Sequence, residues 1–249
     1  MMKVIDRVTS TQYSVKACWE RREETPDALA ARFVRTIDSL QEIDPVFALW
    51  ICGRKRPKKF ETMRDHYAEE VAAGLTKDDL GEPEPIWGYR FGALTRGQAP
   101  DRSFSVRVHA GSTYPMPFPN DIAFYTRPRC IPDPAVITYE IFKRALLAIV
   151  EAWSPDRCAA YPLQILNLVG KGQYFRESWL QYLCPWLASL VTPPPAPVIV
   201  EHLPNGGLLM SATAETFDVE NPAHMAAARA IAAAIAPLNA LPWEERARA

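Results

Sequence analysis

Apolar and polar residues alternate in two segments of the chain, as in a strand with one buried face. Residues 104–110 show this most clearly, with apolar residues at every even position. Around Pro-Asn-Gly-Gly at 204–207, two apolar runs predict a hairpin, because Asn-Gly favours the backbone angles of tight turns. The predicted strands are residues 13–19, 104–110, 122–125, 163–169, 198–203 and 208–213, and residues 46–52 form either a strand or a buried turn.

Other segments repeat their apolar residues every three to four positions, as on the buried side of a surface helix. Thr25-Pro26-Asp27 begins the first of them with an N-cap, a proline suited to the first turn and an acid that complements the helix dipole. Residues 141–153 carry the strongest stripe. The predicted helices are residues 26–44, 60–74, 141–153, 179–190 with a kink or break at Pro185, and 222–236.

The order of these elements indicates the fold class. Strands come in adjacent pairs, and helices do not alternate strictly with them. Tight hairpins favour antiparallel pairing, so the predicted class is α+β, with helices packed on an antiparallel β-sheet. The 23 prolines cluster between predicted elements, and no cluster is long enough to be a linker. A single domain over residues 1–249 is therefore expected.

Charge and composition exclude several classes of protein. The 28 Lys and Arg residues nearly balance the 29 Asp and Glu residues, whereas a general nucleic-acid binder carries a basic excess. The one dense basic run, residues 54–59, is interpreted as a solvated loop, so no nucleic-acid partner is predicted. No secretory leader and no apolar run long enough for a bilayer occur, and the five cysteines form no C-x-x-C pair. A cytoplasmic protein with reduced thiols is expected.

No motif predicts a cofactor, a metal ion or a catalytic residue. Gly170-Lys171-Gly172 lacks the remaining positions of a phosphate-binding loop, and the four histidines have no metal-ligand spacing. His109, on the polar face of a predicted strand, is the strongest candidate for a general base. It has no evident nucleophile or orienting carboxylate. An enzyme with a site around His109 and nearby acids remains the alternative function.

Three acidic groups suit a basic protein partner, since complementary charge speeds association. They are Glu20-Glu23-Glu24, the segment with Asp78, Asp79, Glu82 and Glu84, and Glu215-Asp218-Glu220. The second group, Asp78, Asp79, Glu82 and Glu84, is the predicted partner-binding site. The chain is interpreted as a binding protein and not as an enzyme.

Several blocks of the sequence resemble the immunity protein 52 family. They include Tyr13-Ser-Val-Lys-Ala-Cys-Trp19, the run from Leu40 to Trp50 with Asp44-Pro45, and Asn205-Gly206-Gly207 followed later by Asn221-Pro222. Together they span about residues 12 to 240. The chain departs from the family pattern at Cys18, where tyrosine is expected, and at Glu20, where a glycine often follows the tryptophan.

This resemblance implies a function. Such proteins protect bacteria from toxins encoded by the adjacent gene, many of them type VI-secreted nucleases with a restriction-endonuclease fold. The cognate toxin is then the expected partner, and binding either plugs the nuclease cleft or blocks the toxin's assembly. Self-association into a homo-oligomer stays open, and no membrane is involved.

Overall fold

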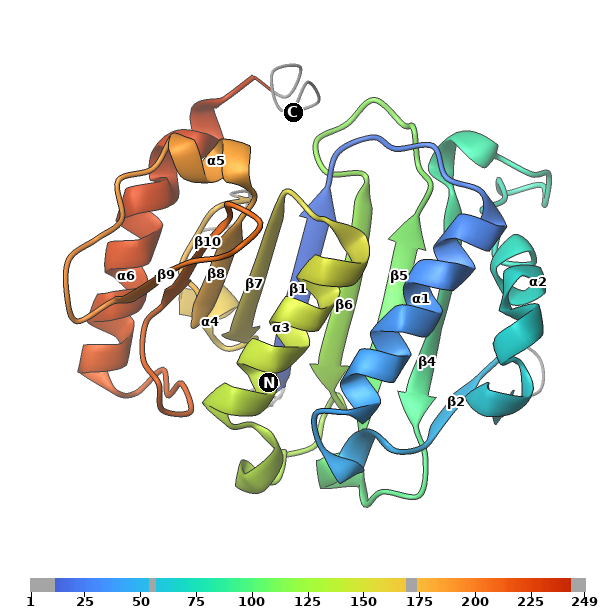
Figure 1. Ribbon diagram of the computed structural model, residues 1–249, viewed down its shortest axis with the longest axis horizontal. Coiled ribbons are helices and arrows are strands. Elements are labelled where there is room, and N and C mark those ends of the chain that lie inside the picture. The colour runs from blue at the N-terminus through green and yellow to red at the C-terminus, as the bar shows by residue number, and fades with distance from the viewer. Residues whose placement is uncertain (1–11, 54–56, 169–173, 243–249) are drawn as a thin grey trace, which may run out of the picture.

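The computed structural model describes residues 12–53, 57–168 and 174–242, and within them the strands form one antiparallel sheet (Figure 1). The strands are β1 (Tyr13–Trp19), β2 (Trp50–Cys52), β3 (Lys58–Lys59), β4 (Tyr89–Thr95), β5 (Phe104–Ala110), β6 (Asn120–Thr126), β7 (Arg157–Pro162), β8 (Leu180–Leu183), β9 (Ile199–His202) and β10 (Leu208–Ser211). Their order across the sheet is β3-β2-β4-β5-β6-β1-β7-β8-β10-β9. The predicted α+β class is confirmed.

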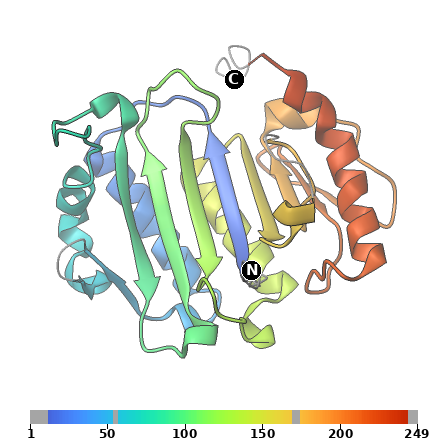
Figure 2. The ribbon, with the colours of Figure 1, turned by 180° about the vertical axis from the view of Figure 1, so that it is seen from behind.

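Helices cover the two faces of this sheet unequally. They are α1 (Pro26–Gln41), α2 (Tyr67–Ala72), α3 (Tyr139–Trp153), α4 (Ile165–Leu168), α5 (Pro185–Ser189) and α6 (Pro222–Ile235). Figure 1 shows α1 and α3 side by side across one face, with α2 beside the β4 edge and α6 near the β8–β10 end. Figure 2 shows that none of the described helices covers β4, β5, β6 and β1 on the other face. We call this the open face.

Each of the helices α1 and α3 matches its prediction at one end: α1 begins at Pro26 as predicted but ends at Gln41, before 44, and α3 ends at Trp153 as predicted but begins at Tyr139, before 141. Thr25 caps α1 by accepting the N–H of Ala28 at 3.3 Å, and the apolar stripe of α1 is buried under the sheet. Thr138 caps α3 in the same way, and Ser154 ends it in the left-handed conformation with φ of 46°. A left-handed residue at this position satisfies helix carbonyls that would otherwise lack partners.

The first strand occupies the middle of the sheet. β1 pairs with β6 on one side and with β7 on the other, so segments far apart in sequence meet along it. Its helix-facing residues Val15, Ala17 and Trp19 are at most 2% exposed, and the Trp19 ring stacks on Trp153 of α3 at 5.3 Å. The strand predicted at residues 13–19 is confirmed, but Ser14 and Cys18 on its other face are also buried, so it does not have the single buried face that the alternation predicts.

Two predictions were wrong. Residues 163–168 form a turn and the single helical turn α4, and not a strand, because closely spaced apolar residues fit either structure; Val169 lies outside the described residues. Residues 179–190 are predicted as a helix with a kink or break at Pro185, but 180–183 form β8 and only Pro185–Ser189 is helical. All four residues of β8 are buried, so the strand shows no alternation.

Two strands had no clear signal in the sequence. β7 consists largely of small buried residues, and β4 contains Gly92 at its centre. A Cβ atom at Gly92 would lie 2.3 Å from the carbonyl oxygen of Val106, so close packing against β5 excludes any larger residue there. Residues 60–74, predicted as one helix, contain two short 3₁₀ turns and α2, while residues 46–52 contain a 3₁₀ turn followed by β2.

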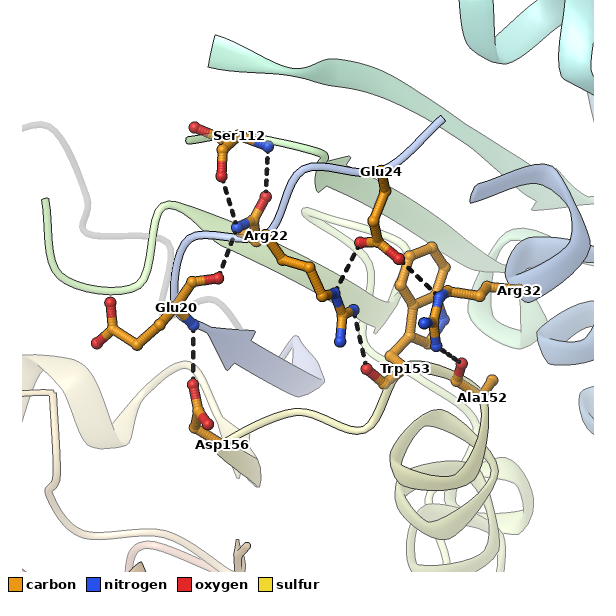
Figure 3. Close-up of polar contacts among 9 residues, drawn as sticks. Glu20, Arg22, Glu24, Arg32, Ser112, Ala152, Trp153 and Asp156 are labelled. Atoms are coloured by element: carbon orange, nitrogen blue, oxygen red, sulfur yellow. Dashed lines mark hydrogen bonds and ion pairs between the residues drawn. The ribbon is translucent and has the colours of Figure 1, made fainter. Parts of the chain in front are cut away.

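A polar network ties the segment after β1 to both long helices (Figure 3). The Glu24 carboxylate, 5% exposed, lies 2.9 Å from Arg22 Nε and 2.7 Å from Arg32 Nε. Arg22 then donates to the carbonyl of Trp153 at 3.0 Å and Arg32 to that of Ala152 at 2.8 Å. These carbonyls end α3, where a helix carries partial negative charge, so the cations stabilise its C-terminus.

Asp156 joins the same region from the start of β7. Its carboxylate accepts the N–H of Glu20 at 2.8 Å (Figure 3). Burial raises the pKa of Asp156 from 3.8 to about 6, against the opposing effects of that hydrogen bond and of Arg22 and Arg157. In the folded protein this carboxyl group therefore keeps its proton up to a higher pH than an exposed aspartate does.

The Glu24 network predicts that loss of the Glu24 charge destabilises the protein much more than loss of the neighbouring Glu23 charge. Glu24→Gln removes the charge that both arginines share and should lower the free energy of unfolding by about 1–3 kcal/mol. Glu23→Gln makes the same chemical change at an exposed position and should alter it by less than about 0.5 kcal/mol. Urea unfolding of both variants measures the difference, and equal stabilities would contradict this account.

Asp156 predicts a pH-dependent change in stability. Because its pKa is higher in the folded protein, the carboxyl group contributes less stability as pH rises from about 4 to about 6. Asp156→Asn keeps an acceptor and cannot ionise. We expect it to stabilise the protein by about 1–2 kcal/mol near pH 7.5 and by less near pH 4.5. The measurement is urea unfolding of both proteins at each pH; a gain that does not change with pH would argue against the raised pKa.

Candidate functional site

The four predicted partner-binding acids lie in residues 76–88, the loop that joins α2 to β4 and projects beside α2 (Figure 1). Asp78 organises its turn. The Asp78 carboxylate accepts the N–H groups of Leu80 at 2.9 Å and Glu82 at 2.8 Å, and the Asp78 N–H donates to the Glu82 carbonyl at 2.9 Å. Gly81 supplies the positive φ, 90°, that the turn requires.

Backbone bonds close the base of this 76–88 loop. Thr76 donates its N–H to Gly88 at 2.9 Å, and Glu84 donates to Thr76 at 2.8 Å. The Ile86 carbonyl accepts the Ser112 hydroxyl at 3.0 Å, and the Trp87 ring stacks on Tyr114 at 3.7 Å. The loop is therefore held from both sides, by its own backbone and by the segment that joins β5 to β6.

The structure brings three of the four acids together. Asp78, Asp79 and Glu84 line one shallow hollow of about 380 Å³, while Glu82 lies outside its lining. Asp79 and Glu82 are exposed, and Asp78 and Glu84 are half-buried. Lys77 and Arg90 also line the hollow and offset part of its negative charge, so the exposed side chains of Asp79 and Glu82 present the acids most directly to a partner.

Exposed apolar side chains accompany these acids. Leu80 is 88% exposed at the tip of the loop, Ile86 is 44% exposed at its base, and Met116 in the neighbouring β5–β6 segment is 37% exposed. An apolar centre with a polar rim is typical of protein interfaces. The charge pattern of the sequence indicates the acids but not Leu80, although a leucine among charged residues, with no apolar neighbour at strand or helix spacing, is a usable signal of an exposed apolar side chain.

The other two acidic groups differ in their exposure. Glu20 and Glu24 take part in the network that ties β1 to the helices, so they are less available to a partner. In the third group, Glu215, Asp218 and Glu220 are all exposed, and the Glu215 carboxylate lies 3.4 Å from Nε2 of the buried His224. Exposure alone therefore does not distinguish the third group from the 76–88 loop.

His109 lies on the open face, and its Nε2 is 2.5 Å from the carbonyl oxygen of Trp87. A carbonyl only accepts, so this nitrogen carries the hydrogen and acts as the donor. Burial is the main cause that lowers the pKa of His109. Asp121 and Arg90 are its cross-strand neighbours. The ring holds the 76–88 loop against β5, and this geometry gives no support to the enzyme alternative.

The remaining sequence motifs add no site. Gly170-Lys171-Gly172 lies outside the described residues, as do residues 54–56 of the basic run, while Lys58 and Lys59 form the exposed edge strand β3. No group of acids, histidines and cysteines in the described ranges could hold a metal ion. The five cysteines are free thiols. None of the described helices is long and apolar enough to cross a membrane.

The fold and the candidate site define a class of protein, an α+β sheet with a rigid loop that displays acidic and apolar side chains. The family model for immunity protein 52 matches residues 11–239. The chain therefore belongs to the immunity protein 52 family, as the sequence resemblance indicated, and this membership supports an immunity role.

Among solved structures, the chain is similar to the Pseudomonas aeruginosa T6SS protein PA0821. The TM-score is 0.48 and the sequence identity 11%, over 88% of this chain and 72% of that one. No curated protein matches the chain.

The role of Asp78 in the 76–88 loop can be separated from that of its neighbour. Asp78→Ala removes the acceptor of two backbone N–H groups, and we expect faster hydrogen exchange at Leu80 and Glu82 by about tenfold. The free energy of unfolding should fall by less than about 1 kcal/mol, because the loop is exposed. Asp79→Ala serves as the matched control and should leave exchange unchanged. Equal exchange in the two variants would show that Asp78 does not order the loop.

Proposed function

We propose that the protein neutralises a nuclease toxin, of the kind delivered by type VI secretion, by binding it through the 76–88 loop. The observation that carries this proposal is the projecting loop itself, with Leu80 88% exposed between Asp79 and Glu82. Membership of the immunity protein 52 family supports a toxin as the partner. The site of action is the cytoplasm, where the nucleic acid that such a toxin attacks is found.

The rigidity of the loop favours tight binding. Its turn is held by the Asp78 carboxylate and its base by the Ile86 carbonyl and the Trp87–Tyr114 stack. A segment that is already ordered loses little conformational freedom when it binds, so more of the contact energy appears as affinity. Leu80 then acts as the apolar anchor that a pocket on the toxin would bury.

Charge supports a nuclease as the toxin. A nuclease binds phosphate groups through a cleft lined with lysine and arginine. The exposed carboxylates of Asp79 and Glu82 have the complementary sign, and such complementarity accelerates association at low salt. Insertion of the loop into the cleft would exclude the nucleic acid. Binding away from the cleft, with loss of toxin assembly, is the alternative that the experiment distinguishes.

The test uses the neighbour-encoded toxin, co-expressed and purified with this protein. Asp79→Asn/Glu82→Gln/Glu84→Gln should weaken toxin binding by at least about tenfold, and Leu80→Ala by about 10- to 100-fold, at unchanged melting temperature. Asp78 is left in place because it orders the loop. Glu140→Gln/Glu151→Gln removes exposed acids from α3 and is the control expected to bind normally. Affinity is measured by calorimetry and protection by growth of the co-expressing cells.

Two outcomes would contradict the proposal. Wild-type affinity in both loop variants would exclude this loop as the contact, and failure to bind any neighbour-encoded toxin would exclude the immunity mechanism as stated. A nucleic-acid competition assay separates the two modes of inhibition. If the loop enters the cleft, DNA or RNA competes with the immunity protein for the toxin; if assembly is blocked, nucleic acid does not compete and the toxin changes its oligomeric state.

A further inference from the structure

A cavity of about 430 Å³ lies on the same side of the sheet as the open face, over β1, β7 and β8. Ala159 lies at its floor and pairs with Lys16 of β1 on one side and Gln181 of β8 on the other. The small methyl group of Ala159 between two long side chains leaves the floor hollow. Phe118 and Tyr174 contribute to the walls. The volume falls within the range of about 300–1,000 Å³ that is usual for small-molecule sites.

Positive charge dominates the lining. Lys16, Arg157 and Arg176 line the cavity together with a single acid, Glu177. Lys16 Nζ lies 3.5 Å from the Asp121 carboxylate. In the part of the chain that the structure describes, neither guanidinium group has a carboxylate within 4.0 Å. Within the described ranges, therefore, no carboxylate neutralises the charge of Arg157 or Arg176.

Aromatic rings fix these cations in place. The Arg157 guanidinium lies 5.3 Å from the ring centre of Phe118, 5.9 Å from that of Tyr174 and 5.5 Å from that of Phe175. The Arg176 guanidinium lies 5.9 Å from the ring of Tyr161. Arg157 Nη2 donates to Cys18 Sγ at 3.6 Å. A ring face attracts a cation without satisfying its N–H donors, so the remaining donors of these positioned groups can bind an anion.

Two buried donors in the lining lack a partner. Ser178 is only 1% exposed, and its hydroxyl group has no hydrogen-bond partner among the described residues. The same holds for Nε of Arg157. Leaving a buried polar group unpaired has a cost in free energy, because the group loses its hydration without gaining a partner, so native proteins seldom do so without a functional reason. A ligand that accepts hydrogen bonds in this cavity would remove that cost.

We propose that the cavity binds a small organic anion, a phosphate monoester up to the size of a mononucleotide. Arg157, Arg176 and Lys16 provide the charge that recognises the phosphate, and Ser178 provides a further donor. The aromatic walls accommodate the body of the ligand, since flat rings pack on aromatic side chains and on guanidinium planes. This site is separate from the 76–88 loop, and its existence does not depend on the proposed toxin contact.

The test measures binding of adenosine monophosphate, inorganic phosphate and adenosine to the full chain by calorimetry, at low and high salt. We expect saturable binding of adenosine monophosphate, weaker binding of phosphate and none of adenosine. Arg176→Met should weaken adenosine monophosphate binding by at least about tenfold. Ser178→Ala should weaken it by about three- to tenfold while leaving the free protein equally stable or more so, because it deletes an unpaired hydroxyl. Arg96→Met, an exposed arginine elsewhere, is the charge-matched control.

Three outcomes would overturn this inference. Binding of neither adenosine monophosphate nor phosphate would exclude an anion site, and adenosine binding as tightly as its monophosphate would exclude phosphate recognition. Equal affinity in Arg176→Met and Arg96→Met would place any site elsewhere. Because these measurements contain no toxin, they stand or fall independently of the immunity assay.

Discussion

The pairing of β1 with β6 and β7 is the constraint on which the rest of the structure depends. Without β1, the sheet would separate into a half ending at β6 and a half beginning at β7. The strand also carries Trp19, which stacks on Trp153 of α3, and leads into the segment where Glu24 binds Arg22 and Arg32. One strand thus joins both halves of the sheet and both long helices.

The same region positions both candidate sites through the segment that joins β5 to β6. Asn120, at the start of β6, accepts the Ser112 N–H at 2.8 Å and donates to the Glu20 carbonyl at 2.9 Å, which fixes both ends of that segment beside the exit of β1. Between them, Tyr114 supports the 76–88 loop and Phe118 forms a wall of the cavity. The projecting loop and the cavity over β1, β7 and β8 therefore share one support, although the ligands proposed for them differ in size and charge.

Sequence patterns predicted β1, β5, α1 and α3, because these elements repeat their apolar residues with the period of a strand or a helix. They failed at β8, where burial on all sides removes the period, and at β4, where Gly92 interrupts it. Three of the four predicted acids line one hollow because they are close together in the sequence. Their contact with a toxin stays a prediction. The cavity could not be predicted from the sequence. Its cationic residues Lys16, Arg157 and Arg176 come together only through the register of β1 with β7 and the segment that leads to β8.

The central position of an N-terminal strand also has a consequence for the timing of protection. Tyr13 pairs with Pro162 and Ser14 with Tyr125, so β1 waits for most of the polypeptide to be synthesised before its neighbours exist. Pairing of segments so distant in sequence is slow compared with local helix formation. A chain still on the ribosome lacks a finished sheet. For the toxin neutralisation proposed above, protection therefore depends on molecules completed before the attack and not on chains still being synthesised.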